Sequence, residues 1–271
     1  MRLRVRHESA YAYATPATRA IETLRLTPRS HDGQFVVDWR IDIDHDCRLD
    51  QSTDPFGNTV HSFTVEGPLP GLVIVAEGRV ETTDTSGVLS GQVERFPPVI
   101  FLRDTPLTMS DEAIRDFARE HAEGKPVDVM HAIMQGIRDR LTFKVDATDT
   151  RTSAVEAFKG GHGVCQDFAH IFIAAVRHLG IPARYVSGYL RRTDGQNEQE
   201  AGHAWAEALI DGLGWVGFDP ANGIAPTDAY VRLAIGLDYL GAAPIRGTRY
   251  GGSGENLTVR IEVEDLARPP R

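Results

Sequence analysis

The hydrophobic residues of this chain change their periodicity part-way along, and this change restricts the fold more than any other feature. In the first hundred residues apolar and polar positions alternate: Val37, Trp39 and Ile41 are separated by charged side chains. Period two is typical of a half-buried β-strand. Further apolar runs at 59–65 and 72–76 are separated by turn-forming residues. We therefore predict a small antiparallel β-sandwich in this part of the chain.

After about residue 110 the apolar spacing becomes helical. Ser110 is the expected N-cap of a first helix, and the second places its apolar residues on one face. Ser153 and Glu156 have the spacing of a capping box, which predicts a short third helix. A longer helix is expected over 165–179, because a glycine and then a proline follow it.

The remainder of the chain returns to strand patterns. Strands are expected at about 183–190, 203–210 and 214–219, and residues 257–263 alternate again. Helices followed by a run of strands indicate an α+β fold. We predict two domains: a β-rich N-terminal domain over 1–105 and a catalytic core over 106–271. The last twenty residues or so of the first domain are expected to form the connection to the second.

Charge and composition exclude several classes of protein. The 29 basic and 38 acidic residues give a net charge of −9, whereas nucleic acids and anionic membranes bind basic surfaces. The longest apolar run has about six residues, far below the ~20 needed to cross a bilayer. With two cysteines, far apart in the sequence, and no secretory signal, we expect a protein of the cytoplasm.

Cys165 has the position of a nucleophile. It follows a glycine-rich segment, GGHGV at 160–164, and begins the expected long helix. A helix N-terminus carries about half a positive charge and free backbone N–H groups. Both stabilise a thiolate, the nucleophilic form of cysteine. The glycines would allow a substrate backbone to approach closely. A free cysteine often only packs as a small hydrophobic residue, but this placement favours reactivity.

His203 is the expected acid–base partner of that thiol. It shares one face of its strand with Trp205, while small apolar residues occupy the other face. If the turn into the next strand consists of residues 211–213, Asp219 lies diagonally across from His203 on the same face. A two-residue turn would instead place them on opposite faces.

These three side chains predict thiol chemistry. Asp219 would orient the imidazole, and His203 would take the thiol proton and return it to a leaving amine. The backbone N–H of Cys165 is a candidate donor to the oxyanion, and the sequence does not identify a second donor. Three further residues are expected to contact the substrate: Gly163, Gln166 and Trp205.

Several other candidate residues have simpler explanations. His162, His170 and His178 have no further ligand at zinc-like spacing, so we expect no metal. The two histidines of the long helix are expected to be partly solvated. Asp167 suits the positive end of that helix.

Two more residues receive no catalytic role. Arg184 is expected to make a structural ion pair. Cys47 lies among aspartates, whose charge would disfavour its thiolate.

Four segments resemble the bacterial transglutaminase-like superfamily: GVCQDFAH at 163–170, GIPARYVSGYL at 180–190, HAWAE at 203–207 and GWVGFDP at 214–220. LRLTP at 24–28 and FGN at 56–58 resemble the β-rich N-terminal region often attached to that core. The resemblance implies a papain-like α+β core, a triad of Cys165, His203 and Asp219, and thiol-dependent acyl transfer on an amide. It implies neither a metal nor an organic cofactor.

Two segments depart from the family pattern. Residues 143–145 read FKV, where the family often has aromatic-x-Tyr. Residues 236–241 read GLDYLG, without the arginine and the second aspartate that often occur there. Both departures leave the triad intact and bear on contacts with the substrate.

The sequence thus predicts a cytoplasmic cysteine peptidase or amidase that acts on a peptide or protein. A protein-glutamine amine transferase is the alternative enzyme, and a non-catalytic peptide-binding module is the alternative of another class. Neither the substrate nor the oligomeric state follows from the sequence.

Overall fold

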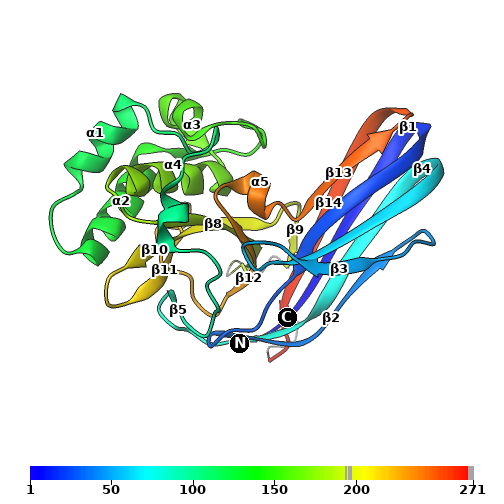
Figure 1. Ribbon diagram of the computed structural model, residues 1–271, viewed down its shortest axis with the longest axis horizontal. Helices are drawn as coiled ribbons and strands as arrows, with labels where there is room; N and C mark the ends of the chain where they lie inside the picture. The colour runs from blue at the N-terminus through cyan, green and yellow to red at the C-terminus, as the bar shows by residue number, and fades with distance from the viewer. Residues whose placement is uncertain (193, 195–196, 268–271) are drawn as a thin grey trace.

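A computed structural model describes residues 1–192, 194 and 197–267. Its first layer is an antiparallel seven-stranded sheet, drawn on the right of Figure 1. Two long central strands, β1 (Arg2–Thr27) and β4 (Thr59–Thr82), pair along most of their length. The other strands of this sheet are β2 (Gln34–Ile43), β3 (Asp50–Thr53), β9 (Glu198–Gln199), β13 (Ile245–Tyr250) and β14 (Ser253–Asp265).

The β-rich N-terminal region (residues 1–105) is present as predicted, with one difference in its arrangement. Its strands are hydrogen-bonded into a single sheet, where a small sandwich was expected. The apolar runs at 59–65 and 72–76 belong to one strand, β4. The pairing of β1 with β4 shifts register near Ala17, and both strands continue past this irregularity.

Both ends of the chain contribute to this sheet. Strand β14 pairs with the first half of β1, and β13 pairs with its second half. Leu3, near the start of β1, therefore lies opposite Asp265, the last residue of β14 (Figure 1). The division at residues 105 and 106 stays a prediction, and the pairing of β13 and β14 with β1 crosses it.

The second layer is a five-stranded sheet in the order β12-β8-β10-β11-β5. Strands β8, β10 and β11 match the three expected strands closely, β12 was not expected, and β5 comes from the segment expected only to connect. The strands are β5 (Val88–Leu89), β8 (Ala183–Leu190), β10 (His203–Ile210), β11 (Gly214–Phe218) and β12 (Tyr230–Gly236). A short parallel pair stands apart: β6 (Thr142–Phe143) and β7 (His162–Gly163).

Helices cover one face of the five-stranded sheet (Figure 1). They are α1 (Glu112–Glu120), α2 (Pro126–Arg140), α3 (Ala154–Gly160), α4 (Cys165–His178) and α5 (Tyr239–Ala242), with a 3₁₀ turn η1 (Pro98–Leu102) before them. The N-cap of α1 is Asp111, one residue after the expected Ser110. The capping box of Ser153 and Glu156 is confirmed.

Helix α4 lies at the centre of the core. The small residues Ala204, Ala206 and Ala208 of β10 leave room for it, and they join its apolar residues in one cluster. Every residue from 166 to 177 is buried, because α4 has neighbours on all sides. The helix ends at His178, and Gly180, two residues later, has a positive φ of 78°. The fold therefore holds the first turn of α4 in a fixed position relative to β10.

Candidate active site

Cys165 is the first residue of α4 and is partly buried. The Asp167 side chain points back toward the residues before α4, where it accepts a hydrogen bond from the backbone N–H of Val164 at 2.8 Å. The same carboxylate oxygen accepts the Thr148 hydroxyl at 2.6 Å. The Asp167 N–H donates to the Val164 carbonyl at 2.9 Å, whereas the N–H groups before it precede the regular hydrogen bonds of the helix, next to the thiol.

Gly163 makes room for Asp167. A Cβ on Gly163 would lie 2.6 Å from Asp167 Oδ2, which is closer than real Cβ contacts allow. The glycine is therefore explained by packing within the protein. Its contact with a substrate stays a prediction.

His203 and Asp219 lie together as the three-residue turn predicts. Ile210 faces Gly214 across the hairpin, so residues 211–213 form the loop. His203 Nε2 lies 2.6 Å from Asp219 Oδ2. Asp219 follows β11 directly, and its position on the face of His203 is a consequence of the register.

Asp219 is completely buried and accepts five hydrogen bonds. His203 Nε2, the Asn222 side chain at 2.7 Å and the Tyr230 hydroxyl at 2.7 Å donate to Oδ2. The backbone N–H groups of Ala221 and Asn222 donate to Oδ1. Burial by itself would raise the pKa of Asp219, but the His203 imidazolium and these donors outweigh burial and lower it.

His203 is held in its charged form. Burial disfavours the imidazolium, but the Asp219 carboxylate and interactions with Cys165 raise the pKa of His203 to about 10. Asp219 occupies Nε2, which leaves Nδ1 for the hydrogen bond to Cys165. The imidazole therefore lies between a buried carboxylate and the thiol, which is the arrangement of a cysteine nucleophile with its acid–base partner.

Two residues of this site were not predicted from the sequence. Tyr230 begins β12, and nothing in its neighbours indicates a contact with Asp219. Asn222 lies in the turn that follows Asp219. The turn-forming sequence Asp-Pro-Ala-Asn-Gly at 219–223 is a signal that could have placed Asn222 near the carboxylate.

Trp205 supports the imidazole from within the protein. Its ring stacks on His203, with centroids 6.2 Å apart, and meets Tyr230 edge to face at 5.4 Å. Only 2% of Trp205 is exposed, so its observed contacts are with the site residues themselves. Gln166 is also buried, and its Nε2 has no hydrogen-bond partner among the described residues. The substrate contacts expected of both residues stay predictions.

The expected solvation of the helical histidines is wrong for one of them. His178 is exposed, but His170 is completely buried. His170 Nε2 accepts the backbone N–H of Tyr239 at 3.1 Å, and burial lowers the pKa of His170 to about 3. Tyr239, the first residue of the short α5, thus reaches His170 on a side of α4 that the apolar stripe had left open.

Arg184 and Cys47 were given no catalytic role, and their surroundings agree with that. Arg184 pairs with Glu207 at 2.6 Å and with Glu94 at 2.9 Å, which confirms a structural ion pair. Burial, together with Asp46 and Asp44, raises the pKa of the Cys47 thiol. Cys47 therefore contrasts with Cys165, which faces an imidazolium.

Within the described residues, no group of three or more histidine, cysteine, aspartate or glutamate side chains is arranged to hold a metal ion. In the same part of the chain, no helix is both long and apolar enough to cross a membrane.

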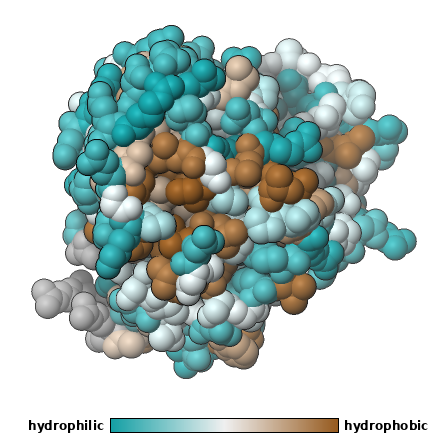
Figure 2. Space-filling view, turned by 60° about the vertical axis from the view of Figure 1, so that its left-hand side comes forward, coloured by the Kyte–Doolittle hydropathy of each residue, from teal (hydrophilic) through white to brown (hydrophobic). Residues whose placement is uncertain are grey.

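Figure 2 shows apolar residues gathered across the middle of one face, between hydrophilic margins.

Comparison with known proteins identifies the family. Residues 115–220 match the transglutaminase-like superfamily, and residues 3–81 match the bacterial transglutaminase-like N-terminal region. An uncharacterized protein of Mycobacterium leprae is 31% identical over 98% of this chain and 99% of its own length. The chain belongs to the transglutaminase-like superfamily.

Other members are related over part of the chain or in fold alone. A protein-glutamine gamma-glutamyltransferase of Pseudomonas aeruginosa is 29% identical over 52% of this chain and 23% of its own length. A crystal structure from Cytophaga hutchinsonii, of a protein assigned provisionally as a cysteine protease, superposes with a TM-score of 0.80. It covers 98% of this chain and 91% of its own, at 21% identity, and so confirms the α+β fold of this superfamily member.

Proposed function

We propose that this transglutaminase-like protein is a cysteine enzyme that transfers the acyl group of a peptide or protein amide, with water as the usual acceptor. One observation carries the proposal: His203 is bonded to a buried carboxylate on one side and faces a cysteine at a helix N-terminus on the other. A module that only binds peptides has no need of this arrangement.

The acylation step follows from these groups. The Cys165 thiolate attacks the amide carbon, and the carbonyl π electrons move to the oxygen. In this proposal the backbone N–H of Cys165 donates to that oxyanion. When the tetrahedral intermediate collapses, the C–N bond breaks and the His203 imidazolium gives its proton to the leaving amine. A thioester and a neutral imidazole remain.

Water completes the reaction. Neutral His203 takes a proton from water, whose oxygen attacks the thioester, and collapse releases a carboxylic acid and the thiolate. The same imidazole could activate an amine instead, and the name of the Pseudomonas aeruginosa relative favours that alternative. The choice depends on how well the acyl site excludes water.

An apolar surface adjoins the nucleophile. Phe143 is 53% exposed and lies on β6, which pairs with β7 immediately before Cys165. Val145 follows and is 62% exposed. These side chains support a substrate with an apolar residue near the reacting amide, because exposed apolar area next to a site is available for binding.

The test is release of ammonia from a glutamine peptide, measured with and without an added primary amine. Hydrolysis produces glutamate and ammonia at a rate that the amine leaves unchanged, while amine transfer produces the substituted amide in proportion to the amine. Peptide-bond cleavage is followed on the same peptide. Cys165→Ser must abolish each reaction, and Cys47→Ser is the matched control that retains it. If the wild-type protein releases neither ammonia nor a cleaved peptide from any member of a panel of varied peptides, an enzymatic role is contradicted.

A further inference from the structure

Strand β12 forms one edge of the five-stranded sheet, and its outer side is covered by amide side chains. The Gln34 side chain accepts from the backbone N–H of Arg232 at 2.8 Å and donates to its carbonyl at 2.9 Å. Asn58 does the same for Ile235, with both bonds at 2.8 Å. Each amide therefore takes the place of one residue of a neighbouring strand.

Both amides come from the N-terminal region and are held there. Gln34 begins β2 and donates to the carbonyl of Arg29 at 2.8 Å. Asn58 follows a turn and donates to Asp54 at 2.9 Å. Each side chain is 3% exposed. Buried amides with matched donors and acceptors on both sides have one orientation, so they fix the distance between the two parts they join.

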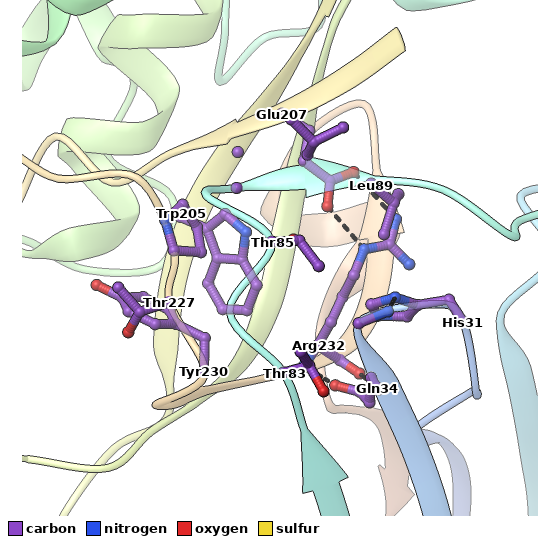
Figure 3. Close-up of a pocket in the computed structure, with 15 residues that line it drawn as sticks. His31, Gln34, Thr83, Thr85, Leu89, Trp205, Glu207, Thr227, Tyr230 and Arg232 are labelled. Carbon is purple, nitrogen blue, oxygen red and sulfur yellow. Dashed lines mark hydrogen bonds and ion pairs between the residues drawn. The ribbon is translucent and has the colours of Figure 1, made fainter. Parts of the chain in front are cut away.

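The strand that they hold carries groups of the candidate active site. Tyr230, the first residue of β12, donates to Asp219 and packs against the His203 ring at 5.7 Å. Two residues later, the Arg232 guanidinium binds both oxygens of Glu207, which lies on the same strand as His203. Figure 3 shows Gln34, Arg232, Glu207, Trp205 and Tyr230 around one cavity between the N-terminal region and the five-stranded sheet.

We propose that Gln34 and Asn58 are positioning residues, through which the N-terminal region holds β12 so that Tyr230 keeps the Asp219 carboxylate directed at His203. The inference rests on the proposed function and extends it, because it assigns a task to the N-terminal region. The region acts on the site through β12 and touches neither the thiol nor the reacting amide.

The test measures the pKa of His203 in folded protein without substrate, from the pH dependence of its ring proton resonances. The resonances are assigned by comparison with His203→Asn. In Gln34→Leu and Asn58→Leu, the side-chain shape is roughly kept and the hydrogen bonds are lost. We expect the His203 pKa to fall by roughly half to one unit, because Asp219 is held less firmly. Gln51→Leu, at an exposed position of β3, is the matched control and leaves it unchanged.

A double-mutant cycle shows whether the effect passes through Tyr230. In a Tyr230→Phe background, Gln34→Leu should lower the His203 pKa no further. A variant with a lower melting temperature and an unchanged His203 pKa overturns the inference, as does an equal shift in both backgrounds. If a leucine variant does not fold, Gln34→Ala, which admits water to the backbone groups, takes its place. Since no substrate is present, this result is independent of whether the proposed reaction is found.

Discussion

Replacement of Asp219 by asparagine removes one charge from the interior and almost no volume. Asp219 receives three donors on one oxygen and two on the other. An asparagine has a single acceptor oxygen, so its NH₂ group must face N–H donors whichever way it turns. The variant therefore loses the carboxylate charge beside His203 and leaves buried donors without partners.

The size of the effect follows from the pKa of His203. Burial opposes the imidazolium, and Asp219 is the first of the groups that overcome it to raise this pKa to about 10. Without the carboxylate we expect the pKa to fall by roughly two to three units, which corresponds to about 3–4 kcal/mol. If that energy is lost from the transition state, kcat/KM falls by roughly 10²–10³-fold.

The assay is the pH profile of kcat/KM for the peptide substrate, together with the His203 ring resonances. The proton given to the leaving amine is lost as the pH rises through the His203 pKa. The alkaline limb of the wild-type profile should thus lie near this value and move down in Asp219→Asn. Asp211→Asn, on the exposed turn of the same hairpin, is the matched control. An alkaline limb and a His203 pKa that both stay in place would refute the reasoning.

Three further changes have definite expected results. Glu207→Gln leaves Arg184, which is completely buried, without its buried partner, and we expect the unfolding free energy in urea to fall by about 3–5 kcal/mol. His7 is buried, and burial lowers its pKa to about 4. As the pH drops from 6.5 to 4, the imidazole is therefore protonated in the unfolded chain but not yet in the folded protein, and the free energy of unfolding falls. In His7→Gln the loss over that interval should be smaller by about 3 kcal/mol. Gly163→Ala crowds Asp167 and should cost about 1–3 kcal/mol and slow alkylation of the nearby thiol.

Each of these changes has its own control. Glu66→Gln removes an exposed ion-pair partner and should leave the urea midpoint almost unchanged. An equal effect of Glu66→Gln and Glu207→Gln contradicts the argument from burial. For His7→Gln, the prediction is contradicted if the free energy of unfolding falls between pH 6.5 and 4 by as much as it does in wild type. Gly160→Ala, at the C-terminal end of α3, meets only the movable His162 ring at 3.3 Å and should be mild. If it is as damaging as Gly163→Ala, contact with Asp167 is not the cause.

The parts of the site that depend on local pattern could be predicted from the sequence. Helix α4 begins and ends where its glycines and proline indicate. The turn at 211–213 sets the register of β10 and β11, and the register alone places His203 and Asp219 on one face. Short-range rules suffice here because few residues separate the interacting groups.

Contacts between distant segments could not be predicted. The sequence contains no signal that Tyr230 reaches Asp219, or that Gln34 meets Arg232 across 198 positions. His170 was expected to be partly solvated because a single apolar stripe was read on α4. On a second side, the backbone N–H of Tyr239, in the four-residue α5, reaches the His170 ring. In the same way, β14 belongs to the first sheet because of its pairing with β1, and its own alternation indicates only that it is a strand.

The central claim is that Cys165 is a nucleophile activated by His203. The most direct measurement is the rate of alkylation of each cysteine by iodoacetamide at mildly acidic pH, followed by peptide mass spectrometry. The account predicts that Cys165 reacts roughly tenfold faster than Cys47 or more, since Cys165 lies at a helix N-terminus beside the His203 imidazole, whereas Cys47 lies among aspartates. It also predicts that His203→Ala removes most of this difference. Equal rates for the two cysteines, or a fast Cys165 that His203→Ala leaves unchanged, would contradict the claim.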